Sequence, residues 1–377
     1  MAHVLSNEKR LEVLGCLVNG SGIRAASRMT GAHQDTIGRF GFAVGVGCER
    51  LHDRLARDLT CSLVDMDEQH SWCSKRQQNV DPKRDDLSVV GEQWTWVAIC
   101  RSTKLVIAWT VGKRDQAHAD LLVEDVRARL LVMPQITTDG LKLYEHAVAI
   151  NFGPAAPYVQ TVKNFSERPS RTATGEKFAP KRGVDFIQKR IISGAAGVNL
   201  DKATTYAAER SNLTNRVWNA RLIRRTLCFS KLFDRHCAAV ALMFTYRALC
   251  HIQRNMRETA AMAAGITDRV WSLEELMVAA LAEPAGEKPR AKPLTIPKPE
   301  GNARELPGNR GWLRAVPAGG SGPAPSPGPA EPPPGAPAVV AAVEPSADPT
   351  GQLDLLAWRP KAKPLPPKGT QLKLFDE

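Results

Sequence analysis

Residues 132–141 read VMPQITTDGL, a short β-branched run that stops at Asp139 and Gly140. A strand that delivers a carboxylate at its C-terminal end, followed by a glycine that lets the backbone turn, is typical of catalytic edges in α/β sheets. An isolated Asp-Gly pair is more often a surface turn. Asp139 therefore predicts a site only if other acids converge on it.

Upstream, residues 61–67 read CSLVDMD and form the first candidate partner. Read as a strand, this segment places Leu63, Asp65 and Asp67 on one face, because side chains alternate with a period of two. The face offers two acids, and the periodicity alone does not separate them.

Residues 206–227 form the second candidate, a long predicted helix. An apolar stripe with helical periodicity is expected to face the core: Tyr206, Leu213, Val217 and Ala220. Glu209 lies about 60° from this stripe. We expect it to emerge at the edge of the core, where the carboxylates of a buried strand can meet it.

Between the first acids and Asp139, two further strands are predicted at residues 93–100 and 105–111. Residues 101–104 are short enough to join them as a hairpin. A helical run at residues 118–131 then leads into the strand before Asp139. The sequence therefore predicts an α/β fold, and the order of its elements is that of ribonuclease H-like domains, whose three carboxylates hold two divalent metal ions.

The same segments resemble the DDE transposases of the insertion sequence one group. The similar blocks occur in one order: DEQHSW at 67–72, WTWVAICRSTKLVIAWTVGKRD at 94–115, ITTDGLKLYEHAV at 136–148, ERSNLTNR at 209–216 and TDRVWSLEEL at 267–276. With gaps, the resemblance extends over residues 5–276. It implies a ribonuclease H-like enzyme that cuts and joins DNA ends, working as a dimer or larger assembly on DNA.

Carried over by matching positions, the resemblance makes Asp67, Asp139 and Glu209 the catalytic and metal-binding triad, with Asp65 as the alternative first acid. The interval before Glu209 is long for this family, so an elaborated segment is expected there. The sequence departs from the family pattern at His70 and Ala208, and in the helix beyond Arg216. These departures leave room for a divergent or domesticated relative.

Three carboxylates suit the implied reaction. Phosphodiester cleavage and transfer build negative charge on the attacking and the leaving oxygen, and two metal ions about 4 Å apart stabilise both. Mg²⁺ prefers oxygen ligands and keeps positions open for water and phosphate. We therefore expect two Mg²⁺ ions, for which Mn²⁺ can substitute.

The N-terminal residues 1–58 predict a helix-turn-helix segment. Short helices are expected at residues 23–29 and 33–40, with a turn at Gly31 between them. A plain three-helix packing unit is the alternative interpretation. If the segment reads DNA, Gln34 and Arg39 are its expected contacts, although nearby glycines weaken the last helix.

Residues 59–230 form the expected catalytic domain, and its later part is strongly basic. Residues 161–225 contain 14 Lys or Arg against 5 acidic residues, and an inserted segment is expected at about 161–203. We interpret the excess as a DNA track beside the third carboxylate, the alternative being a solvated basic surface. The expected contacts are Lys181, Arg182, Lys189, Arg190, Arg216, Arg224 and Arg225.

The whole chain of 377 residues has a net charge of +12, which fits a polyanionic partner such as double-stranded DNA. Its eight cysteines lack zinc-site and disulfide-framework spacing. No secretory or membrane-spanning segment is predicted, so a cytoplasmic, nucleoid-associated protein of a prokaryote is expected.

Residues 231–280 predict a helical extension, and residues 281–351 a disordered Pro-rich linker. The tail, residues 352–377, contains QLKLF, similar to the peptide by which bacterial proteins dock on the sliding clamp. The expected clamp contacts are Gln371, Leu372, Leu374 and Phe375. A chance match is the alternative, and titrating a clamp with the isolated tail would decide between them.

Two other functions stay open from the sequence. One is a transposase relative that has lost catalysis and acts as a DNA-binding regulator or targeting factor. The other is a ribonuclease H-like nuclease outside transposition.

Overall fold

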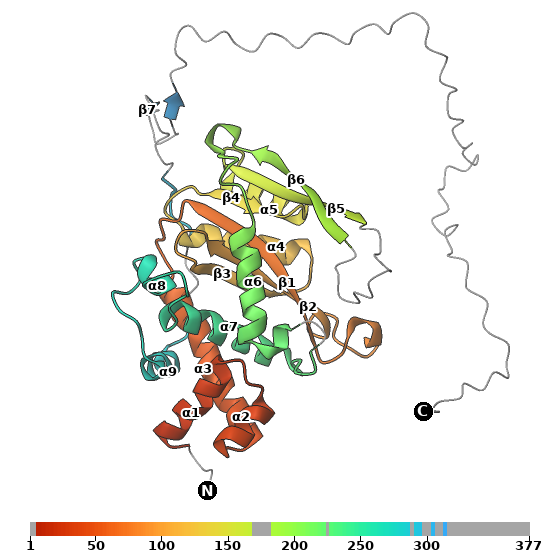
Figure 1. Ribbon diagram of the computed structural model, residues 1–377, viewed down its shortest axis with the longest axis vertical. Coiled ribbons are helices and arrows are strands. Elements are labelled where there is room, and N and C mark those ends of the chain that lie inside the picture. Colours follow the sequence, from red (N-terminus) through yellow and green to blue (C-terminus); the bar gives the residue numbers. More distant parts are fainter. Residues whose placement is uncertain are drawn as a thin grey trace, which may run out of the picture. The chain divides into compact units, whose positions relative to one another are not determined.

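The computed structural model describes residues 5–167, 182–223, 226–286, 290–295, 303–305 and 312–314. Figure 1 shows its elements along the chain. The helices are α1 Asn7–Val18, α2 Ile23–Thr30, α3 Gln34–Leu55, α4 Gln116–Arg129, α5 Leu143–Phe152, α6 Tyr206–Trp218, α7 Phe233–Leu249, α8 Ala260–Ala263 and α9 Leu273–Ala282. The strands are β1 Leu63–Cys73, β2 Gly91–Cys100, β3 Val106–Gly112, β4 Gln135–Thr138, β5 Tyr158–Glu167, β6 Arg182–Ser193, β7 Ala303–Glu305 and β8 Trp312–Arg314.

Six strands form one mixed sheet in the order β3-β2-β1-β4-β5-β6. Strands β1, β2 and β3 pair as antiparallel neighbours, whereas β4 and β5 run parallel to β1. The helices α4 and α5 connect the parallel strands, and β6 returns antiparallel to β5. The predicted α/β class is confirmed, as are strands at the three segments expected between residues 61 and 111.

One face of the sheet is apolar and packs against α4 and α5. The two helices pack on each other and on the same buried cluster, which includes Val64, Met66, Trp96, Leu122, Val126 and Tyr144. Alternate residues of β1 therefore point into this core. Burying such side chains contributes about 1.5–3 kcal/mol each, so this layer fixes β1 and β4 firmly.

The opposite face is covered by α6 over β1 and by α7 over β3. The prediction that the apolar stripe of α6 faces the core is wrong, because Tyr206 is 65% exposed, Leu213 51% and Val217 74%. The helix instead buries small and polar residues: Ala207, Ala208, Ser211, Asn212 and Asn215. The sheet beneath it carries Asp65, Asp67 and Gln69, which an apolar stripe would leave without hydrogen bonds.

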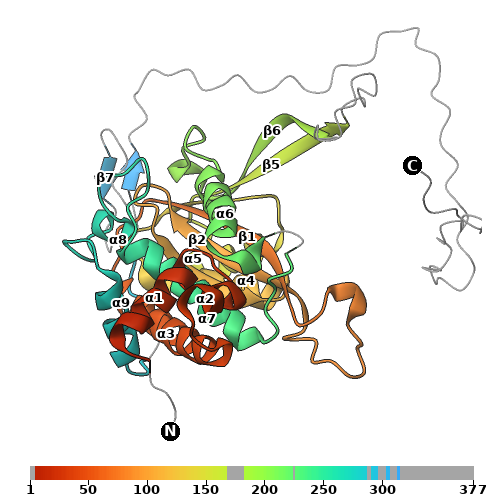
Figure 2. The same cartoon turned by 60° about the horizontal axis from the view of Figure 1, so that its bottom comes forward.

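The N-terminal helices pack with the helices that follow the sheet. Helix α3 continues to Leu55, well beyond the predicted short helix, and shares a buried cluster with α7 and α9. Figure 2 shows α1 to α3 beside α7 and α9. A Cβ atom at Gly45 or Gly47 would lie 2.3 Å or 1.9 Å from a backbone oxygen of α7 or α9. These glycines therefore permit close helix packing.

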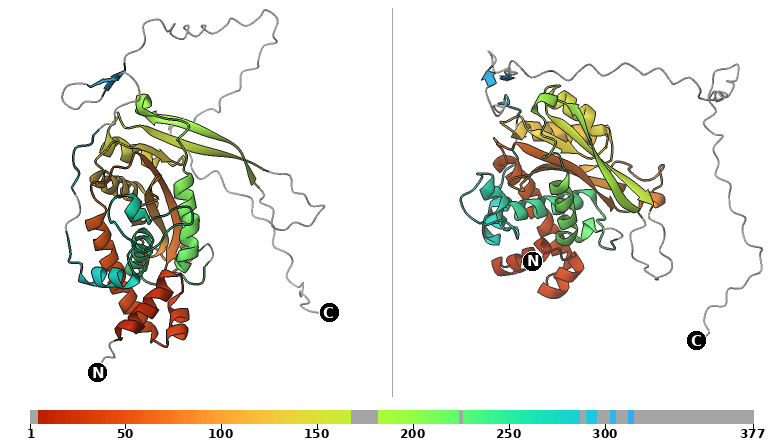
Figure 3. Two further views of the ribbon diagram at one scale, coloured as in Figure 1. Left: turned by 60° about the vertical axis from the view of Figure 1, so that its left-hand side comes forward. Right: turned by 45° about the horizontal axis from the view of Figure 1, so that its top comes forward.

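The expected elaborated segment before Glu209 contains a long antiparallel ribbon of β5 and β6. Only residues 158–160 of β5 pair with β4, while its pairing with β6 continues to Glu167 and Arg182. The ribbon consequently extends past β4 (Figure 3).

Within the segment predicted as a linker, β7 and β8 pair with each other, and Thr295 bridges to Val132. The tail lies outside the described residues. Among the helices that the structure describes, none has the length and apolar composition needed to cross a membrane.

Candidate metal centre

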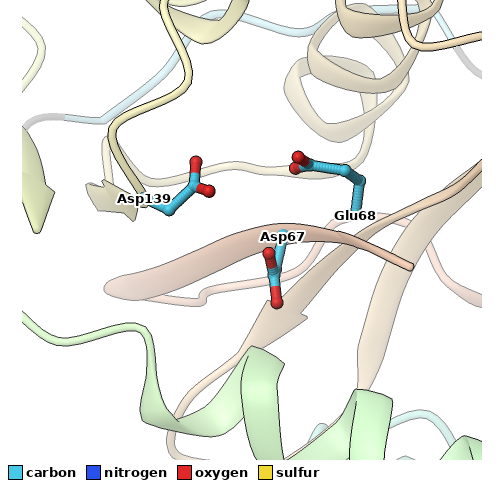
Figure 4. A group of neighbouring side chains, drawn as sticks. All are labelled: Asp67, Glu68 and Asp139. Carbon is cyan, nitrogen blue, oxygen red and sulfur yellow. The ribbon is translucent and has the colours of Figure 1, made fainter. Parts of the chain in front are cut away.

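Asp67 and Asp139 come from adjacent parallel strands. The register pairs Asp65 with Thr137, so Asp67 stands level with Asp139, the residue that directly follows β4. Together with Glu68, these two acids each offer a carboxylate oxygen, and the three oxygens lie within 4.8 Å of one another. Figure 4 shows the group around the end of β4. The predicted convergence of acids on Asp139 is thus present for Asp67.

Glu68 is the third member of this group, and the sequence analysis did not select it. Successive strand residues point to opposite faces, so Asp67 points toward α6 whereas Glu68 points toward the side of α5. Arg114 forms an ion pair with Glu68, and the Tyr144 hydroxyl donates to its Oε2 at 3.3 Å. In the sequence, Glu68 directly follows Asp67. Because successive strand residues point to opposite faces, this position argued against placing both acids in one group.

Like charges crowd this group. Burial raises the pKa of Asp67 to about 7, and the carboxylates of Glu68 and Asp139 add to that shift. Burial and Asp139 also raise the pKa of Glu68, while Arg114 opposes the rise. A divalent cation would relieve this repulsion, and its preferred ligands are carboxylate oxygens. The three acids therefore fit a hard cation such as Mg²⁺.

Asp65, the alternative first acid, lies outside this group. It is fully buried, forms an ion pair with Arg101, and accepts a hydrogen bond from the backbone N–H of Ala207 at 3.3 Å. Arg101 also donates to the carbonyls of Lys202 and Thr204, just before α6. Asp65 therefore anchors the start of α6 to β1, and the geometry favours Asp67 as the metal-facing acid.

Glu209 is not brought into the group of three acids. It lies on the first turn of α6, where Lys163 forms an ion pair with its Oε1 and the Thr205 hydroxyl donates to the same oxygen at 2.6 Å. Its side chain is 41% exposed. Asn212, one turn further along α6, is the residue that contacts the group of three acids.

Asn212 donates a hydrogen bond from Nδ2 to Oδ2 of Asp67 at 2.9 Å. Its own carbonyl accepts from Gln69 at 3.2 Å, and Asn215 donates to the Gln69 side chain at 3.2 Å. The guanidinium of the buried Arg247 donates in turn to Asn215. These hydrogen bonds fix the orientation of the Asp67 carboxylate from the side of α6. Asn212 and Asn215 are three residues apart, and that helical spacing was their signal in the sequence.

Asp139 is held by the turn that follows β4. Its Oδ1 accepts a hydrogen bond from the backbone N–H of Leu141 at 3.0 Å. Gly140 does not adopt a left-handed conformation, and a Cβ atom there would lie 3.2 Å from Val162. Close packing against β5 is therefore what favours glycine, in place of the tight turn expected from the sequence.

The residues expected to contact DNA have different surroundings. Gln34 and Arg39 are exposed on the first turns of α3. Lys189 and Arg190 are exposed on β6, and Arg216 is half-buried on α6. Arg182 begins β6. Lys181, Arg224, Arg225 and the clamp residues Gln371, Leu372, Leu374 and Phe375 lie outside the described residues.

No protein-family model matches the sequence, and no curated protein matches it either.

Proposed function

We propose that this protein is a metal-dependent DNA transposase with a ribonuclease H-like catalytic domain. The observation that carries the proposal is the convergence of Asp67 and Asp139 from neighbouring parallel strands, with Glu68 beside them. The strand order β3-β2-β1-β4-β5, with helical connections before β4 and β5, also supports it, because ribonuclease H-like domains share this order. The resemblance to DDE transposases supplies the link to transposition.

The proposed chemistry assigns a role to each acid. Asp67, Glu68 and Asp139 would hold the first Mg²⁺, and Glu209 would contribute to the second. When bound, such ions neutralise the charge that builds on the attacking and leaving oxygens of a phosphodiester. Asn212 keeps the Asp67 carboxylate oriented toward the centre. Arg114 and Lys163, each at least 31% exposed, stand beside the acids as candidate phosphate contacts.

Double-stranded DNA is the proposed substrate, supported by the net charge of +12 and by exposed basic residues such as Lys189 and Arg190. Phosphate contacts of this kind give affinity without sequence preference. We extend the proposal to a homo-oligomer on DNA and to the sliding clamp as a tail partner, both from the sequence resemblances alone.

The test is metal-dependent cleavage of DNA that carries the terminal sequences of the mobile DNA element that encodes the protein. Asp67→Asn and Asp139→Asn should each reduce the rate by at least about 100-fold while DNA binding persists, because each removes a metal ligand with little change of shape. Asp58→Asn is the matched control: Asp58 is paired with Lys292 and has φ of 55°, a conformation that Asn tolerates. Normal cleavage by either acid variant would refute the proposed centre.

One observation keeps a second function open. Glu209 is bound by Lys163 rather than grouped with Asp67 and Asp139. A catalytically inactive DNA-binding regulator or targeting factor would have no need to release it. The same assay separates the possibilities, because a regulator binds DNA without cutting it, and a nuclease outside transposition cuts without joining.

A further inference from the structure

The Glu209 carboxylate has two partners, both on the same oxygen. Lys163 on β5 forms the ion pair, and Thr205 at the start of α6 donates a hydrogen bond at 2.6 Å. The Lys163 side chain is 31% exposed and that of Glu209 41% exposed. Breaking an ion pair at such exposure costs little free energy.

This pair stands one helical turn from the metal centre. Asn212, three residues after Glu209, touches Asp67 at 2.9 Å. Residues three apart lie side by side on a helix. Lys163 belongs to β5, the strand that pairs with β4 just before Asp139. Lys163 therefore contacts the first turn of α6 from the strand that neighbours Asp139.

The N-terminal half of helix α6 is attached to the sheet by a contact that is poor in apolar area, since the buried apolar cluster there contains Ile99, Ala207 and Ala208. At the other end of the helix, Trp218 packs on a separate apolar cluster. Within the described part of the chain, the buried hydroxyls of Thr137 and Ser211 have no hydrogen-bond partner. Hydrogen bonds that join α6 to Asp65, Asp67 and Gln69 therefore hold the helix in place. What can turn at little cost in free energy is the side chain of Glu209 itself, which is 41% exposed.

We propose that Lys163 is a positioning residue that couples DNA binding to completion of the metal centre. In the free protein it holds Glu209 away from Asp67 and Asp139. A DNA phosphate that arrives at the metal centre forms an ion pair with the ammonium group of Lys163. The released Glu209 carboxylate then turns toward Asp67 and Asp139. The inference rests on the proposed function. By linkage, DNA and metal then raise each other's affinity by the same factor.

The first experiment measures DNA affinity without metal, in EDTA, with a short duplex of arbitrary sequence. Glu209→Gln frees Lys163, so affinity should rise about fivefold, consistent with one additional phosphate contact. Glu283→Gln removes the same charge from another ion pair, with Arg54, and should change affinity by less than about twofold. Lys163→Met should cost more affinity in the Glu209→Gln background than in the natural sequence. Equal costs in both backgrounds would overturn the coupling.

The second experiment titrates Mn²⁺ by calorimetry with and without the same duplex. DNA should raise the Mn²⁺ affinity of the natural protein about tenfold. It should leave the Mn²⁺ affinity of Lys163→Met unchanged, and it should raise that of Lys163→Arg, which restores the charge. Lys75→Met, which breaks the pair with Asp85, should leave the tightening intact. Tightening that survives Lys163→Met refutes the inference.

The two proposals fail in different ways. If the natural protein binds Mn²⁺ no better than Asp139→Asn does, the metal centre itself is refuted. If Asp139-dependent binding is present but DNA does not strengthen it, the metal centre stands and only the role of Lys163 is refuted.

Discussion

Asp65 and Asp67 stand two residues apart on one face of β1, and burial raises the pKa of both carboxyls, yet their charged neighbours act on them in opposite directions. Asp65 is neutralised by Arg101, whereas Asp67 faces Glu68 and Asp139. Arg101 therefore offsets the cost of burying the Asp65 charge, whereas the neighbours of Asp67 add to the cost of burying its charge.

Asp67→Asn should therefore stabilise the metal-free protein at neutral and alkaline pH. The pKa of Asp67 rises from 3.8 to about 7 on folding, so the folded state binds its proton more tightly and the free energy of unfolding falls as pH rises between these values. Removing the charge should raise that free energy at pH 8 by on the order of 1–3 kcal/mol, with little gain at pH 4. Urea unfolding in EDTA at both pH values measures it, and a loss of stability at pH 8 would contradict the assignment.

Helix α6 is attached to the sheet by several polar contacts, and Asp65 takes part in those at its start. Asp65 accepts a hydrogen bond from the first turn of α6 and binds Arg101, which in turn holds the carbonyls of Lys202 and Thr204. Tyr206, Leu213 and Val217 of α6 are exposed, and the large apolar side chain that packs, Trp218, lies at the far end of the helix.

Asp65→Asn should accordingly destabilise the protein by about 2–4 kcal/mol, because it leaves the Arg101 guanidinium without its buried counter-charge. Hydrogen exchange should increase first in α6, while Mn²⁺ affinity at Asp67 and Asp139 changes little. Asp58→Asn, on an exposed ion pair, provides the reference for a neutral substitution. A large loss of metal affinity with unchanged exchange in α6 would return Asp65 to the metal centre.

The elements also show what a sequence can predict. The strands carrying Asp67 and Asp139 were predictable, because their apolar residues pack on α4 and α5 with ordinary periodicity. The orientation of α6 was not, because its partner surface is a polar face of the sheet and apolar periodicity misleads there. Glu68 was missed for a related reason. Strand alternation places Glu68 and Asp67 on opposite faces of β1, but beyond the end of β4 the side chains from both faces can approach Asp139.

At the scale of the whole molecule, two buried histidines make the fold sensitive to acid. Ser71 and Ser230 each form a hydrogen bond with the His236 ring at 3.1 Å, and His52 on α3 lies 3.0 Å from the carbonyl of Ile107. Burial lowers the pKa of both to about 3, with nearby arginines adding to the effect. Each ring is therefore neutral in the folded protein at pH 5.

Unfolded histidine has a pKa near 6.5, so the unfolded state binds more protons and stability falls as pH drops from about 6.5 toward 3. At pH 5 each histidine should contribute a loss of about 2 kcal/mol relative to pH 8. His236→Gln should flatten this dependence in urea unfolding, and His146→Gln, at a side chain 57% exposed, should not. An unchanged slope in His236→Gln would show that the ring is not neutral in the fold.

The cluster around α3 joins residues that lie far apart in the sequence, since Val44, Cys48 and Leu51 pack with Leu242 of α7 and Leu276 of α9. A ribosome makes α3 long before it makes α9. During translation, α3 ends at Leu55, whereas its packing partners begin only at Phe233 and Leu273. The first turns of α3 can pack at once on α1 and α2 through Val13, Ala26 and Ile37, whereas the rest of α3 stays without its packing partners until α7 and α9 emerge.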